Sequence, residues 1–108
     1  MEIKTIRSYF QSDHVLYSRH ALFEMKSEEF GRIYDIEVEQ AIHNGEIIAE
    51  YPEDKPYPSV LIFGKTKINR PIHIVCALNQ NENMAIIVTV YQPDPAIWID
   101  GRERRKQP

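Results

Sequence analysis

The chain has 108 residues, a length that fits one domain with a modest but adequate core. Its composition, 43% apolar and 27% charged, is ordinary for a globular protein, and no apolar run approaches the roughly 20 residues that span a bilayer. A single cysteine excludes an internal disulfide or a cysteine-rich zinc site, and the amino terminus has no apolar signal segment, so we expect a cytoplasmic protein.

The net charge of −3 argues mildly against a nucleic-acid binder, but the charge is unevenly distributed. Residues 1–54 carry 5 Lys+Arg against 12 Asp+Glu, a net of −7, whereas residues 55–108 carry 8 against 4, a net of +4. The basic half would therefore suit a polyanion. Charge asymmetry is also common, however, where glutamates simply keep the outer faces of helices in contact with water.

Apolar periodicity predicts three helices in the first half, over residues 2–11, 19–29 and 35–44. Ser18 and Asp35 are placed as N-caps and Gly45 ends the third helix, while 13–17 is a link or a short strand. The residues expected to face the core are Ile3, Ile6 and Phe10, then Ala21, Leu22 and Met25, then Val38, Ala41 and Ile42.

Four strands are predicted in the second half, over residues 46–51, 59–63, 72–78 and 84–91. A short element at 96–99 and a frayed basic tail at 101–108 would follow. Helices followed by consecutive strands predict a single α+β domain over 1–108, with its core at about 15–100. Two or three helices would pack on one face of a four-stranded antiparallel sheet.

The register of the two long strands decides which side chains share a face. If Leu78 pairs with Met84, then His73 opposes Thr89 on the open face and Tyr91 lies one diagonal step away. The apolar residues that would then face the helices are Ile72, Ile74, Val88 and Val90, with Cys76 as a buried filler.

Five stretches, in this order, resemble the domain-of-unknown-function family 4258 over roughly residues 15–100. They are Ser18-Arg19-His20-Ala21, EVEQAIHNGEII, YPEDKPYPSVLIFG, RPIHIVCAL and IIVTVYQPDPAIW. The chain departs from the family where an arginine often follows the Ser-x-His helix, because Met25-Lys26 and Glu28-Glu29 stand there. The family is similar to the RelE-like and MqsR-like toxins. That similarity implies helices on a small antiparallel sheet, RNA cleavage on the open sheet face, and an antitoxin partner of zinc-finger type.

RNA cleavage without a metal needs a base for the 2′-hydroxyl, an acid for the leaving 5′-oxygen, and groups that hold the phosphorane charge. Histidine suits the first two roles because its unperturbed pKa is near 6.5. His20, near a helix N-terminus, and His73, on the open face, are predicted as the acid–base pair, with Tyr91 and Thr89 assisting. The competing interpretation is structural: His20 caps its helix, His73 bonds Thr89 across the ladder, and Tyr91 packs.

Cations near this face are candidate phosphate ligands. Arg70 is close in sequence to His73, and Lys65, Lys67 and Arg19 complete the predicted substrate-binding set. The basic tail would add affinity for RNA or for an acidic partner. The histidines and acids show no metal-ligand spacing, so neither a metal nor a cofactor is expected.

Two other functions compete with a toxin-like, metal-independent endoribonuclease. The first is a non-catalytic module that binds a protein, such as an antitoxin-like partner, through the same sheet face. The acidic net charge and the sparse catalytic constellation favour it. The second is a small-molecule enzyme with its site in the same concavity.

Overall fold

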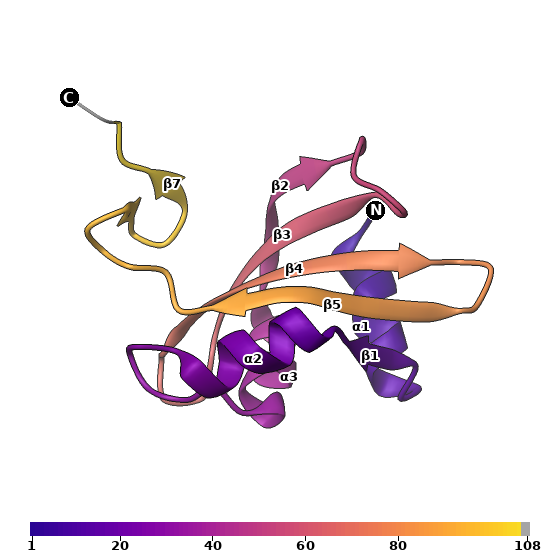
Figure 1. The fold of residues 1–108 in the computed structure, drawn as a ribbon, viewed down its shortest axis with the longest axis horizontal. Helices are drawn as coiled ribbons and strands as arrows, with labels where there is room; N and C mark the ends of the chain where they lie inside the picture. Colours follow the sequence, from indigo (N-terminus) through magenta and orange to yellow (C-terminus); the bar gives the residue numbers. More distant parts are fainter. Residues whose placement is uncertain (107–108) are drawn as a thin grey trace.

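The structure, a computed structural model, describes residues 1–106 as one α+β unit (Figure 1). The helices are α1 (Ile3–Gln11), α2 (Arg19–Ser27) and α3 (Asp35–Asn44). The strands of the main sheet are β1 (Val15–Tyr17), β2 (Glu46–Tyr51), β3 (Ser59–Lys65), β4 (Pro71–Asn79) and β5 (Met84–Tyr91), and β6 (Trp98–Ile99) pairs with β7 (Glu103–Arg104). Within residues 1–106, no helix combines the length and apolarity that crossing a bilayer requires.

The sheet has five strands in the order β1-β5-β4-β3-β2, and it is mixed. The expected four-stranded antiparallel sheet is therefore wrong at one edge, where β1 runs parallel to β5. Strands β2 to β5 do form an antiparallel meander, because each is joined to the next by a short connection. β1 comes from the segment between α1 and α2 and is far from β5 along the sequence. No hairpin therefore joins the two strands and forces them to be antiparallel.

The three helices supply one side of the core, and alternate residues of the sheet supply the other. Ile6, Met25 and Ile42 pack with Ile72 and Ile74 in a single buried cluster. The predicted inward stripes of α1 and α3 are confirmed as core or core-packed positions, but Leu22 of α2 is 52% exposed. Ser18 caps α2 by accepting from the Ala21 amide at 3.0 Å. Asp35, the predicted N-cap of α3, is instead its first helical residue, and Tyr34 is the N-cap.

Helix α2 also closes the outer edge of β5 beyond the end of β1. The Ser18 hydroxyl donates to the Val88 carbonyl at 3.0 Å. The Val90 amide donates to Glu24 at 3.1 Å, and the Gln92 amide donates to Glu28 at 2.6 Å. Side chains from α2 and its flanks thus satisfy backbone groups that a strand would otherwise pair, which removes an exposed sheet edge.

The register between β4 and β5 differs from the expected one. Leu78 pairs with Ala85 rather than Met84, and a bulge leaves Val88 without a partner, so His73 opposes Tyr91 rather than Thr89. After the bulge, β5 is shifted by two residues from the expected register, so its side chains lie on the expected faces. Before the bulge it is shifted by one residue, so its side chains lie on the faces opposite to those expected. Val88 is accordingly not a core residue, and the inward-facing residues of β5 are Ala85, Ile87 and Val90.

The β6–β7 hairpin lies at one end of the sheet, on the side opposite α2 and α3 (Figure 1). Residues 103–104 were expected to belong to a frayed tail, but they pair with Trp98 and Ile99. Asp100, Gly101 and Arg102 connect the two strands, and the first two have φ values of 52° and 73°, the left-handed conformation that tight turns require. The last two residues of the expected tail, 107–108, lie outside the described residues.

Candidate functional site

His73 is the third residue of β4 and is enclosed by the hairpin. Its ring is fully buried, with aromatic neighbours on three sides. The ring centroids of Trp98, Tyr91 and Phe63 lie 4.5, 5.1 and 5.7 Å from that of His73, all edge-on. The sheet face that the sequence predicts to be open is therefore covered at this position.

Both ring nitrogens of His73 have hydrogen-bond partners, and these partners fix its tautomer. Nε2 lies 2.5 Å from the Gly101 carbonyl, which can only accept, so Nε2 carries the proton. Nδ1 then accepts from the Tyr91 hydroxyl at 3.0 Å. Burial lowers the pKa of His73 below its usual value, with the Gly101 carbonyl opposing that shift, and burial raises the pKa of Tyr91 to about 12. The pair is thus a neutral imidazole and a protonated phenol near neutral pH.

The lowered pKa of His73 predicts a loss of stability in acid. The unfolded chain binds a proton as the pH falls through about 6.5, whereas the folded chain binds it only at lower pH, so unfolding becomes easier by at most about 1.4 kcal/mol per pH unit. We expect urea midpoints of the wild type to fall more than those of His73→Gln between about pH 7.5 and about pH 5.5. His43→Gln, on the exposed face of α3, is the control, and equal pH dependence in all three proteins would contradict the argument.

A hollow of about 390 Å³ lies over the rings that cover His73, and we call it the C-terminal hollow. Phe63 and Trp98 supply aromatic surface, and Lys65 and Arg105 supply positive charge beside one carboxylate, that of Asp100. Two further cations stack on the same rings: Arg102 lies 5.1 Å from the centroid of Phe63 and Arg104 lies 5.7 Å from that of Trp98. Arg102 also pairs with Glu46, so part of this charge is neutralised internally.

His20 does not join His73. Its side chain is 65% exposed on α2, and its Nε2 lies 3.3 Å from Glu24 Oε1 one helical turn away. The hydrogen-bond partners of His73 are Tyr91 and Gly101 instead. Of the four residues predicted to be catalytic, the structure brings together His73 and Tyr91. Thr89 lies opposite Val75, and His20 faces solvent.

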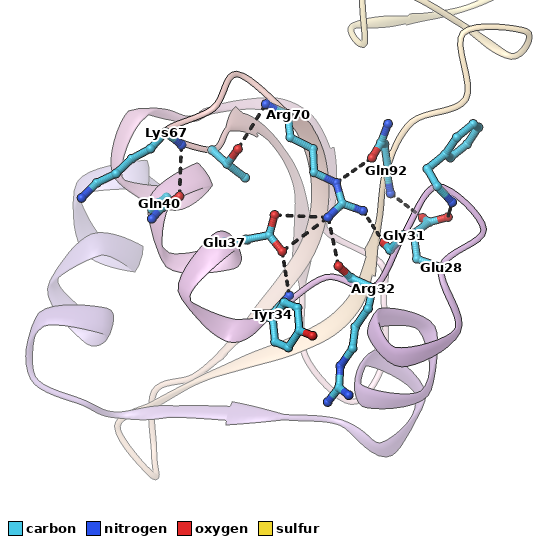
Figure 2. Close-up of polar contacts among 11 residues, drawn as sticks. Glu28, Gly31, Arg32, Tyr34, Glu37, Gln40, Lys67, Arg70 and Gln92 are labelled. Atoms are coloured by element: carbon cyan, nitrogen blue, oxygen red, sulfur yellow. Dashed lines mark hydrogen bonds and ion pairs between the residues drawn. The ribbon is translucent and has the colours of Figure 1, made fainter.

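Arg70 is the centre of a hydrogen-bond network that joins three separate parts of the chain (Figure 2). Its Nε donates to Gln92 at 2.6 Å, and its Nη1 donates to Glu37 at 3.2 Å and to the Arg32 carbonyl at 3.0 Å. Its Nη2 donates to the Gly31 carbonyl. Each nitrogen of the guanidinium is therefore occupied by the protein itself, which leaves little capacity for a phosphate.

The other predicted cations are exposed. Lys65 lines the C-terminal hollow, whereas the side chain of Lys67 extends away from Arg70 in Figure 2 and Arg19 lies in the first turn of α2. In the part of the chain that the structure describes, no group of three or more His, Cys, Asp or Glu side chains is arranged to hold a metal.

Sequence reasoning missed the hairpin and, with it, the C-terminal hollow. A short element was expected at 96–99, and the Arg-rich segment after it was expected to fray. The pair Asp100-Gly101 was an available signal, because Asp-Gly is typical of hairpin turns. Strands of two residues are too short for alternation to reveal them.

The fold and site define an α+β domain with helices on one face of a mixed sheet and an aromatic, basic hollow on the other. The model of the family described as a domain of unknown function, DUF4258, matches residues 17–92. The chain belongs to this family, as the sequence motifs predicted. The match ends before the β6–β7 hairpin, so the part of the cover over His73 that Trp98 and Gly101 supply lies outside it. No match was found among curated proteins or among solved structures.

Proposed function

We propose that the chain binds single-stranded RNA in the C-terminal hollow and acts there as a toxin-like, metal-independent endoribonuclease. The observation that carries the proposal is the grouping of Phe63 and Trp98 with Lys65 and Arg105 around one hollow. Proteins that hold single strands combine aromatic rings, on which bases stack, with cations that follow the backbone. RNA also suits the surplus of positive charge in the second half of the chain.

The cleavage step rests on the hydrogen-bonded pair of His73 and Tyr91. His73 lies beneath the rings of Phe63 and Trp98 that line the hollow, whereas Tyr91 lines a neighbouring hollow on the α2 side. In this proposal the Tyr91 hydroxyl, protonated at neutral pH, donates its proton to the leaving 5′-oxygen, and His73 receives the proton of the 2′-hydroxyl.

The Gly101 carbonyl accepts from Nε2 of His73, so this role requires the hairpin to move off the imidazole when RNA binds and the ring proton to shift to Nδ1, which leaves Nε2 free to accept. After the step, Nδ1 returns its proton to the Tyr91 oxygen, which restores both groups. His20, paired with Glu24 at the surface, has no part in this version of the chemistry.

The binding proposal predicts that Lys65→Ala and Arg105→Ala weaken the affinity for a labelled single-stranded RNA. Each variant should also reduce the dependence of log K on log salt by about 0.7, the value for one phosphate contact on a single strand. Fluorescence anisotropy at several salt concentrations measures both quantities, and quenching of Trp98, the only tryptophan, reports stacking. Lys4→Ala, on the exposed side of α1, is the matched control. Equal losses in all three variants would overturn the assignment of the hollow.

The same RNA, incubated with the protein and without metal, tests cleavage. Products with cyclic phosphate ends that form with the wild type and His20→Ala, but not with Tyr91→Phe or His73→Gln, would support the Tyr91–His73 pair. Binding without cleavage would restrict the proposal to RNA binding. Each variant is first checked for a cooperative unfolding transition, because His73 is buried.

A second candidate function is a non-catalytic protein-binding module. The enclosure of His73 favours it, because a buried imidazole with both nitrogens satisfied is what a purely structural histidine requires. In that case His73→Gln lowers stability, and neither the wild type nor the variant cleaves RNA.

A further inference from the structure

A second hollow, of about 410 Å³, lies on the other side of the segment that leads from β5 to β6. Pro93, Pro95 and Trp98 of this segment line the C-terminal hollow, whereas Asp94 and Ile97 line the second one. Its other walls come from the end of α2, the residues just after it, and the end of β5. We call it the α2 groove.

The α2 groove carries a single sign of charge. Glu24, Glu28, Glu29 and Asp94 line it, and neither lysine nor arginine is among its lining residues. Three of these carboxylates are held by backbone amides: Glu24 accepts from Val90, Glu28 from Gln92 and Asp94 from Ala96. The negative charge is therefore fixed in position before any ligand arrives, which reduces the cost of ordering it on binding.

Apolar side chains lie beside this charge. Phe30 and Ile97 line the groove and are each 43% exposed. Phe23, which is 70% exposed, lies one helical turn before Ser27, another lining residue, so the apolar surface continues from the groove along α2. Large aromatic side chains left this exposed next to a hollow are typical of protein interaction sites.

We infer that the α2 groove binds a basic, amphipathic segment of a partner protein, with apolar residues against Phe23, Phe30 and Ile97 and lysine or arginine against the carboxylates. The charge decides this choice of occupant. Four carboxylates repel a nucleic acid or an anionic membrane, and they attract a polypeptide whose basic residues flank apolar ones. RNA binding is assigned to the C-terminal hollow, whose lining residues are all different, although Tyr91 of the proposed cleavage pair lies in the wall of the α2 groove.

The test uses a labelled amphipathic peptide of leucine and lysine, together with a twin in which glutamate replaces lysine. We expect the basic peptide to bind the full chain and the acidic twin not to bind. Phe23→Ser and Glu29→Lys should each weaken binding by about tenfold, as removal of a central aromatic or reversal of a facing charge does. Glu29 is the carboxylate to change, because Glu24 and Glu28 also hold the edge of β5.

Ile68→Ser and Glu53→Lys are the matched controls, since both positions are exposed and neither lines the groove. Equal binding of the two peptides, or equal loss in test and control variants, would overturn the inference. Sedimentation of the chain alone tests whether a second copy of the chain occupies the groove instead. A dimer that Phe23→Ser converts to a monomer would assign the surface to that second copy and would also overturn the inference. RNA affinity, measured on the same variants, should not change.

Discussion

We expect Gly64→Ala to lower the free energy of unfolding by about 3 kcal/mol or more, at the upper end of the cost of overpacking. A Cβ at Gly64 would lie 1.9 Å from the carbonyl oxygen of Ala41 and 2.6 Å from its carbonyl carbon. These atoms belong to the backbone of α3, so no side chain can turn aside and the whole helix would have to move away from β3. Urea denaturation followed by circular dichroism measures the loss.

Gly31→Ala separates this effect from the ordinary cost of replacing a glycine. At Gly31 the nearest atom to a new Cβ is 4.0 Å away, but φ is +109°, so only backbone strain applies, at about 1–2 kcal/mol. At Gly64 the φ is not in the left-handed region and only the close approach applies. If Gly64→Ala is no more destabilising than Gly31→Ala, the packing of α3 on β3 is looser than these distances indicate.

Arg70→Ala should lower the free energy of unfolding by about 3–5 kcal/mol, the range for removing one partner of a largely buried ion pair. The Arg70 side chain is 15% exposed and its ion-pair partner Glu37 is 16% exposed. The substitution leaves that carboxylate and the carbonyls of Gly31 and Arg32 without their donor. Arg70→Lys should recover only part of the loss, because an ammonium cannot reproduce the planar arrangement of donors.

Lys67→Ala is the control for Arg70. The residue lies three positions earlier in the same loop, is exposed, and contacts Gln40 through its backbone amide, which alanine retains. We expect it to change stability by less than about 0.5 kcal/mol. A comparable loss in both variants would mean that the loop as a whole, and not the guanidinium network in Figure 2, stabilises this end of the molecule.

The role of Arg70 illustrates why a candidate site read from sequence is incomplete. A loop arginine three residues before a histidine was a reasonable phosphate ligand. Its actual partners, Gly31, Arg32, Glu37 and Gln92, lie between 22 and 39 residues away along the chain. His73 and Tyr91 were correctly placed on one face, because a period of two survives a register shift of two residues. Whether that face is open was decided by the hairpin.

The sequence by itself determined the helices, the long strands and most of the buried residues, because caps, glycine stops and apolar periodicity act within a few residues of one another. Ser18, Gly45 and the stripe of Val38, Ala41 and Ile42 are of this kind. The tertiary structure alone decided the parallel pairing of β1, the bulge at Val88 and the covering of His73 by Trp98 and Gly101. Each of these depends on contacts between segments that are far apart in the chain. The free energies of such contacts cannot be read from a pattern of neighbouring residues.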